Sequence, residues 1–241
     1  VSDGSLTDTG TLTLDITSVD DPLSFNNLDN GAVLGTDGNV TEVDLAAGNN
    51  PSGTGETLTG SFDISVPDGI SSLTVGATAI TLAELTDAGT TPIVINTTYG
   101  ELTINGFTDN SATRLGTAEL DYSYTLTSPA DHSASDVNEV IALLLTDSDG
   151  DTQAGSLAIK IIDDAPVIGV VPVVTTVDEQ HLNNGSNPTP ASTSVSADLN
   201  VNFGADEDNT LTFTADQFAL DAWRDASGND DITFDVNGNI L

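Results

Sequence analysis

Apolar and polar residues alternate along this chain of 241 residues, and this period of two restricts the fold more than any other feature. Apolar residues occupy every second position in six short segments: 12–16, 62–66, 102–104, 122–126, 157–161 and 211–213. Such alternation, rich in β-branched residues, predicts half-buried antiparallel strands. Turn signals lie between them: Pro67-Asp68-Gly69, Tyr99-Gly100, Asn105-Gly106, Asp149-Gly150 and Asn237-Gly238. Many short strands predict an all-β fold of the β-sandwich type, with helical turns only at 214–223 and 82–85.

The charge balance restricts the partners. The chain has 38 acidic residues against 3 basic ones, Arg114, Lys160 and Arg224, for a formal net charge of -35. A nucleic-acid backbone or an anionic membrane surface would be repelled by it. Hydrophobic residues still make up 37% of the chain, so cores can form. The carboxylates then need a counter-charge, and we expect divalent cations to supply it.

Further absences narrow the class of protein. There is no cysteine, so disulfides and thiolate ligands are excluded, and metal ions remain as the cross-link for an extracellular protein. No apolar run approaches the roughly 18–20 residues of a membrane span, so we expect no membrane insertion. Val1 leads directly into Ser2-Asp3-Gly4, which is unlike a signal peptide, and we expect an internal piece of a longer protein.

Two internal matches indicate a tandem array. The frame E-x-x-L-x-x-G-x-N-P occurs at 42–51 and again at 179–188, and a glycine, an alternating strand and an Asp-Asp-(Ala)-Pro ending occur at 10–22 and 155–166. The period is roughly 140 residues. We therefore expect the closing strand of one unit at 1–21, a complete unit at 22–166 and the opening of a third at 167–241. The third unit is either truncated or a split domain that is completed by another partial piece.

These motifs resemble a known repeat. The segments 42–51, 67–70, 98–104, 122–126, 131–133, 145–151 and 162–166 occur in the order found in the type I secretion repeat of giant bacterial RTX adhesins. Residues 167–205 resemble the opening of another such repeat, and 1–21 resemble the tail of a cadherin-like repeat. The glycine-rich nonapeptide repeat G-G-x-G-x-D and a C-terminal secretion signal do not occur here, so this piece is expected to lie upstream of both.

The resemblance implies a fold, a location and a role. The fold is a series of immunoglobulin/cadherin-like β-sandwich domains joined by calcium-binding linkers. The location is extracellular, on the bacterial cell surface after type I secretion, and the role is attachment and biofilm formation. The partners are neighbouring repeats of the same long chain and host or microbial surface peptides or glycans, and we expect a monomer.

Topology suggests where calcium binds. In an immunoglobulin-like sandwich the turn between the last two strands, here 147–151, lies at the end where the chain enters. Ca²⁺ takes 6–8 oxygen ligands, which acidic clusters can provide. The predicted ligands of the first junction are Asp20, Asp21, Glu42, Asp147, Asp149 and Asp151. Those of the next junction are Asp163, Asp164 and Glu179, with a turn containing Asp206 or Asp230 and Asp231.

The alternative is that these are solvated acidic turns, as charge runs usually are. With 3 basic residues in the whole chain, the clusters favour calcium. The turn 147–151 is not an EF-hand, because its glycine comes two positions early and Ala158 stands where the final glutamate belongs. Transition metals are not expected, since only His132 and His181 offer softer ligands.

We do not expect an enzyme. The two histidines lie in different units, and the sequence has no G-x-S-x-G, P-loop or G-x-G-x-x-G motif. A calcium-dependent tip module that binds a peptide end or a sugar is the alternative to a structural segment. Trp223 beside Arg224 could stack on a sugar or hold a carboxylate, or Trp223 could instead pack into a core.

Overall fold

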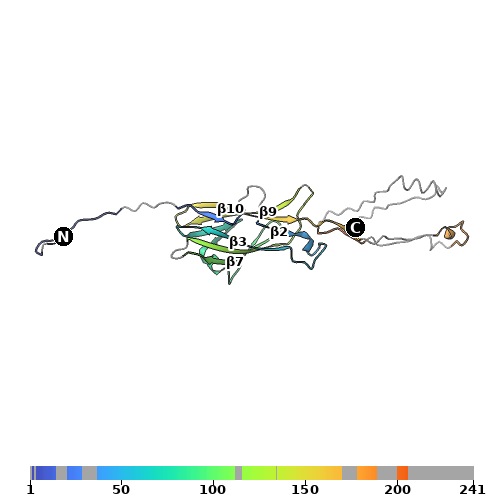
Figure 1. Cartoon of the computed structure of the whole chain (residues 1–241), viewed down its shortest axis with the longest axis horizontal. Coiled ribbons are helices and arrows are strands. Elements are labelled where there is room, and N and C mark those ends of the chain that lie inside the picture. The colour runs from blue at the N-terminus through green and yellow to red at the C-terminus, as the bar shows by residue number, and fades with distance from the viewer. Residues whose placement is uncertain are drawn as a thin grey trace. The chain divides into compact units, whose positions relative to one another are not determined.

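The computed structural model describes residues 2, 4–14, 21–28, 37–111, 116–133, 135–169, 178–188 and 200–205. In these segments most regular structure is β-strand, arranged in two five-stranded sheets and one two-stranded sheet. The predicted all-β class is therefore confirmed (Figure 1).

The first sheet has the strand order β1-β3-β8-β7-β6. Its strands are β1 (Ser24–Asn26), β3 (Thr57–Ser65), β8 (Thr117–Leu126), β7 (Gly100–Asp109) and β6 (Ile93–Asn96). The pairs β1–β3, β3–β8 and β6–β7 are antiparallel. Phe62 lies opposite Leu120 and Ile64 opposite Ala118, so apolar side chains gather on one face.

The second sheet has the order β2-β10-β9-β4-β5. Its strands are β2 (Gly38–Thr41), β10 (Thr152–Ile162), β9 (Val137–Asp147), β4 (Ile70–Val75) and β5 (Thr78–Thr81). The short helix α1 (Leu82–Asp87) follows β5 and confirms the helical turn predicted at 82–85. It begins at a capping box in which Thr81 and Glu84 bond to each other's backbone, and it buries Leu85.

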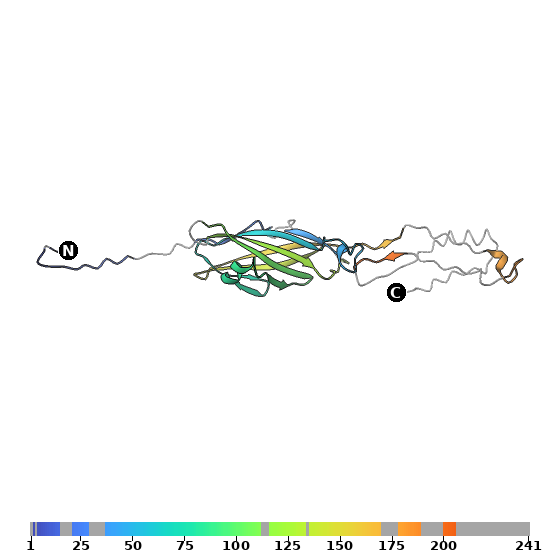
Figure 2. The same ribbon diagram turned by 90° about the horizontal axis from the view of Figure 1, so that it is seen from below.

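The core lies where the two sheets contact each other. In β9 every second side chain is buried, as the alternation predicts. The Tyr124 hydroxyl on β8 donates a hydrogen bond to Oε2 of Glu139 on β9, at 3.4 Å. A Cβ at Gly155 on β10 would lie 2.8 Å from the ring of Phe25 on β1, so this glycine makes room for an aromatic side chain of the other sheet. The long strands of both sheets lie roughly along one axis (Figure 2).

Two sequence predictions are wrong. The turn predicted at Asn105-Gly106 lies inside β7, and a Cβ at Gly106 would be 2.4 Å from Oδ2 of Asp121, so the glycine admits a neighbouring side chain instead of reversing the chain. The strand predicted at 12–16 does not form over the described residues 12–14, where Leu12 and Leu14 are 85% and 72% exposed. A strand needs a partner for its backbone groups, and no strand of the described segments pairs there.

Other predictions fall outside the described residues, namely the strand at 211–213, the helical turn at 214–223 and the turn Asn237-Gly238. The turns at 67–69, 99–100 and 149–150 are confirmed, since each lies between consecutive strands or at the first residue of one.

The chain divides into two compact units. Unit 1 comprises residues 1–39, 57–125 and 138–160 and contains most of both large sheets. Unit 2 comprises 40–56, 126–137 and 161–241, with two 3₁₀ turns, η1 (Glu42–Asp44) and η2 (Glu179–His181), and the antiparallel pair β11 (Val167–Ile168) and β12 (Val201–Asn202). The tandem boundaries after residues 21 and 166 stay a prediction. Among the described segments there is no helix with the length and apolar character of a membrane span.

Candidate metal centres

The loop 42–51 has a defined hydrogen-bonded conformation in unit 2. Its η1 turn begins after Thr41, whose hydroxyl accepts a hydrogen bond from the N–H of Val43. Three backbone bonds then close the loop: Leu45 N to Glu42 O at 3.0 Å, Gly48 N to Leu45 O at 2.8 Å, and Asn50 N to Val43 O at 2.7 Å.

The loop 179–188 repeats this conformation. Its η2 turn follows Asp178, and the corresponding three bonds join Leu182 N to Glu179 O at 3.1 Å, Gly185 N to Leu182 O at 2.8 Å, and Asn187 N to Gln180 O at 2.8 Å. The repeated sequence frame therefore corresponds to a repeated local structure.

The shared glycine of the frame has the same cause in both loops. A Cβ at Gly48 would lie 2.4 Å from the carbonyl oxygen of Glu42, and a Cβ at Gly185 would lie 2.2 Å from that of Gln180. These distances are shorter than a carbon–oxygen contact allows, and the obstacle is backbone that cannot rotate away. Only glycine fits the closed loop at this position.

A first group of possible metal ligands lies in unit 1 and comprises Asp68, Asp147 and Asp149. Asp68 belongs to the turn between β3 and β4, Asp147 ends β9, and Asp149 lies in the turn before β10. One carboxylate oxygen of each lies within 4.8 Å of the other two. The two turns are joined because Ser148 donates from both its N–H and its hydroxyl to the carbonyl of Gly69, each at 2.9 Å.

The electrostatics of this group centre on Asp147, which is only 2% exposed. Its Oδ1 accepts hydrogen bonds from the N–H groups of Gly150 at 2.9 Å and Asp151 at 2.8 Å. Its Oδ2 is buried, and no N–H of the described residues reaches it. A buried anionic oxygen without an N–H donor is costly, and a proton or a cation beside it lowers that cost.

The pKa values of Asp147 and Asp149 are shifted in opposite directions. Burial acts to raise the pKa of Asp147, but hydrogen bonds from Asp149 and from the N–H groups of Gly150 and Asp151 outweigh it and hold that pKa below its usual value. The pKa of Asp149 is raised, chiefly because its carboxyl shares a hydrogen bond with Asp147, and also through burial and the charges of Asp147, Asp151 and Asp68. The raised pKa of Asp149 thus reflects negative charge concentrated at this point, where a cation would be attracted.

This donor set fits a hard cation. Asp68, Asp147 and Asp149 offer only oxygens, and two of them lie at turns where main-chain carbonyls and water can complete a coordination shell of 6–8 ligands. The sequence predicted Asp147 and Asp149 as ligands but missed Asp68. The Pro67-Asp68-Gly69 turn signal was visible, but its position beside the end of β9 depends on strand pairing.

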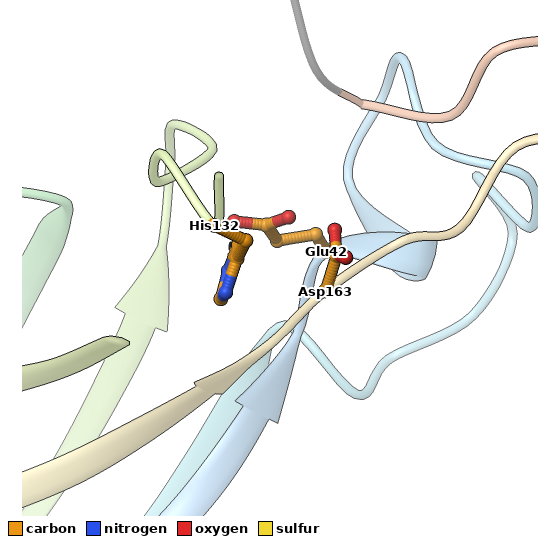
Figure 3. A group of neighbouring side chains, drawn as sticks. All are labelled: Glu42, His132 and Asp163. Carbon is orange, nitrogen blue, oxygen red and sulfur yellow. Dashed lines mark hydrogen bonds and ion pairs between the residues drawn. The ribbon is translucent and has the colours of Figure 1, made fainter. Parts of the chain in front are cut away.

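A second group lies in unit 2 and comprises Glu42, His132 and Asp163, again with ligand atoms within 4.8 Å of one another. Glu42 is completely buried. Its Oε1 accepts a hydrogen bond from the N–H of Ala130 at 2.7 Å and lies 3.2 Å from Nε2 of His132. Figure 3 shows the Glu42 side chain extending between His132 and Asp163. Sequence reasoning had grouped Glu42 with the 147–151 turn and had not included His132, whose pairing across nearly ninety residues leaves no local signal.

The remaining predicted ligands are dispersed. Asp151 contributes its N–H to Asp147 and has an exposed side chain, Asp21 is exposed outside regular structure, and Glu179 is exposed in η2. Asp164 is buried, and both of its carboxylate oxygens accept hydrogen bonds from Asn49. The predicted ligands Asp20, Asp206, Asp230 and Asp231, and the pair Trp223 and Arg224, lie outside the described residues.

The sequence matches no protein-family model and no curated protein.

Proposed function

We propose that this chain is a calcium-binding structural and adhesive segment of a giant secreted bacterial adhesin, in which immunoglobulin/cadherin-like β-sandwich repeats are stiffened by Ca²⁺. The observation that carries the proposal is the group Asp68, Asp147 and Asp149, where a buried carboxylate oxygen without an N–H donor faces two further carboxyls. A divalent ion bound by these carboxylates offsets two of their three negative charges.

The composition supports calcium for the whole chain. With 38 acidic residues and 3 basic ones, protein cations cannot balance the charge. Self-repulsion of this size destabilises a compact chain, and bound divalent ions oppose it. An ion that binds only the folded state adds stability by mass action.

The repeated loop supports the adhesin assignment. Stacked copies of one structural unit form long, quasi-one-dimensional proteins, and an adhesin needs such reach from the cell surface. The loops 42–51 and 179–188 have the same closed conformation, which supports such a repetition. Attachment, biofilm formation and type I secretion follow from the resemblance of these motifs to RTX adhesin repeats.

Thermal unfolding with calcium and with a chelator tests the calcium site. At a hundredfold excess of Ca²⁺ over its Kd, we expect the Tm to rise by roughly 5–10 °C. Asp147→Asn and Asp149→Asn should lose most of this rise. Asp87→Asn, which removes an exposed carboxylate at the end of α1, is the matched control and should keep it.

Isothermal titration calorimetry then separates a specific site from diffuse screening. We expect the stoichiometry to fall by one ion in Asp149→Asn and to stay unchanged in Asp87→Asn. Equal calcium responses in the wild type and both site variants would refute this site. Scattering of Asp149→Asn/Asp151→Asn should show whether the site also sets the extension of the chain.

A further inference from the structure

Asp164, which follows β10, is a buried carboxylate with specific neutral partners in unit 2. It is 3% exposed. The N–H of Asn49 donates to Oδ2 at 2.8 Å, and the side-chain amide of Asn49 donates to Oδ1 at 2.7 Å. The same amide also donates to the carbonyl of Ala165 at 2.9 Å. Asn49 thus donates hydrogen bonds to both carboxylate oxygens of Asp164 and to the carbonyl of the next residue.

The loop presents Asn49 in a fixed position. Asn49 lies between Gly48, whose N–H bonds to Leu45, and Asn50, whose N–H bonds to Val43. The side-chain amide of Asn50 donates to Oδ1 of Asp44, and the N–H of Gly55 donates to Oδ2 of the same carboxylate at 2.7 Å. Since the loop is closed by its own hydrogen bonds, little conformational entropy is lost when it holds the aspartate.

A third segment, residues 200–205, packs against Asp164. A Cβ at Gly204 would lie 2.4 Å from the carbonyl oxygen of Asp164 and 3.1 Å from its Oδ2, and the φ of Gly204 is +87°. The adjacent Ala205 is 5% exposed. The pairing of β11 with β12 and the bond from Gly169 N to Asn200 O, at 3.0 Å, bring this segment alongside the residues that follow Asp164.

We propose that the loop 42–51 is a receptor for the acidic linker that leaves β10, with Asn49 as the positioning residue, Asp164 as the bound carboxylate and Gly204 as the cover. The joint between the loop, the linker and the following segment is held by hydrogen bonds and close packing and requires no metal ion. Asp164 therefore acts as a hydrogen-bond acceptor, in contrast to its predicted role as a calcium ligand. This joint uses none of the side chains Asp68, Asp147 and Asp149, so it stands or falls separately from the proposed function.

The proposal is tested by hydrogen exchange on the full chain, with calcium and with chelator. We expect residues 163–169 and 200–205 and the N–H of Asn49 to stay protected in chelator. Asn49→Asp places a second carboxylate against Asp164, and we expect exchange in these segments to accelerate about tenfold or more, because hydrogen bonds to a charged group are lost. Asn138→Asp introduces the same charge at an exposed position of β9 and should change nothing there.

An exchange of the two side chains gives the decisive comparison. In Asn49→Asp/Asp164→Asn the side-chain donor and acceptor change places, so exchange should be clearly slower than in Asn49→Asp alone, although the bond to the carbonyl of Ala165 is not restored. This comparison is made in the presence of calcium, so it tests the contact between residues 49 and 164 even if the chain unfolds in chelator. Gly204→Ala should expose 200–205 while leaving the N–H groups inside the loop protected, and Gly89→Ala, where a Cβ meets open space, is its control.

Two results would overturn the proposal. One is loss of protection at 163–169 on chelation while the large sheets remain protected, which would show that a metal holds the linker. The other is a double variant that exchanges as fast as Asn49→Asp alone, which would show that the two side chains do not recognise each other.

Discussion

Glu42 provides the sharpest test of how the repeated loop differs between its two copies. It is completely buried, and its Oε1 accepts the N–H of Ala130 at 2.7 Å and lies 3.2 Å from Nε2 of His132. The equivalent residue of the second loop, Glu179, is exposed. The same substitution at the two positions therefore separates the contribution of these partners from that of the loop itself.

The expected loss of stability in Glu42 variants follows from the hydrogen-bond partners of this side chain. Glu42→Gln keeps an acceptor oxygen for Ala130 but loses the charge, and a hydrogen bond to a charged group exceeds a neutral one by about 1–2 kcal/mol. Glu42→Ala removes the acceptor and leaves the buried N–H of Ala130, itself 4% exposed, without a carboxylate. We expect a loss of about 1–3 kcal/mol from the free energy of unfolding, the cost of leaving a buried donor unsatisfied.

Urea unfolding of the Glu42→Gln, Glu42→Ala and Glu179→Ala variants measures these differences in one series. Glu179→Ala should stay within about 0.5 kcal/mol of the wild type, because exposed substitutions away from special contacts rarely exceed this. If Glu42→Ala and Glu179→Ala were equally mild, the burial and hydrogen bonding of Glu42 would not stabilise the fold, and the reasoning would be refuted.

Three further predictions concern other parts of the chain. Burial raises the pKa of Tyr122 and of Tyr124 to about 12, with added contributions from nearby carboxylates. Because tyrosines of the unfolded chain lose their protons first, near pH 10, stability should be constant below that pH and fall between about pH 10 and 12, by at most about 1.4 kcal/mol per pH unit for each tyrosine. Urea midpoints across this range, with the Phe variants as controls, check it. Gly48→Ala should cost about 2–3 kcal/mol because its Cβ meets two backbone carbonyls, whereas an unchanged urea midpoint would show that the loop can open freely. Thr81→Ala removes the N-cap of α1 and should cost about 1 kcal/mol in the same assay, and no loss would mean that the capping box is not stabilising.

Local patterns in the sequence were sufficient for several of the long strands. The period of two placed the inward side chains of β3, β8 and β10 correctly, because alternate residues of a strand point to opposite faces. The helical turn predicted at 82–85 lies within α1, whose cap is made by residues three apart in the sequence. The ten-residue frame also predicted a repeated structure, because all of its closing hydrogen bonds lie within the frame.

Other features were decided only when distant strands paired. Asn105-Gly106 has the composition of a turn, but β7 continues through it because Gly106 accommodates Asp121 of β8. Asp68 joins Asp147 and Asp149 because β4 pairs with β9, and that register is set by packing over the whole sheet.

The sequence by itself determined the class of the fold and the positions of the acidic turns, since each depends on composition or on residues close along the chain. The tertiary structure decided which carboxylates meet, which of them is buried and which is held by an amide. The burial of a carboxylate and the hydrogen-bond donors that reach it depend on distant segments. Asn49 and Asp164 are 115 residues apart, and no local pattern encodes that contact.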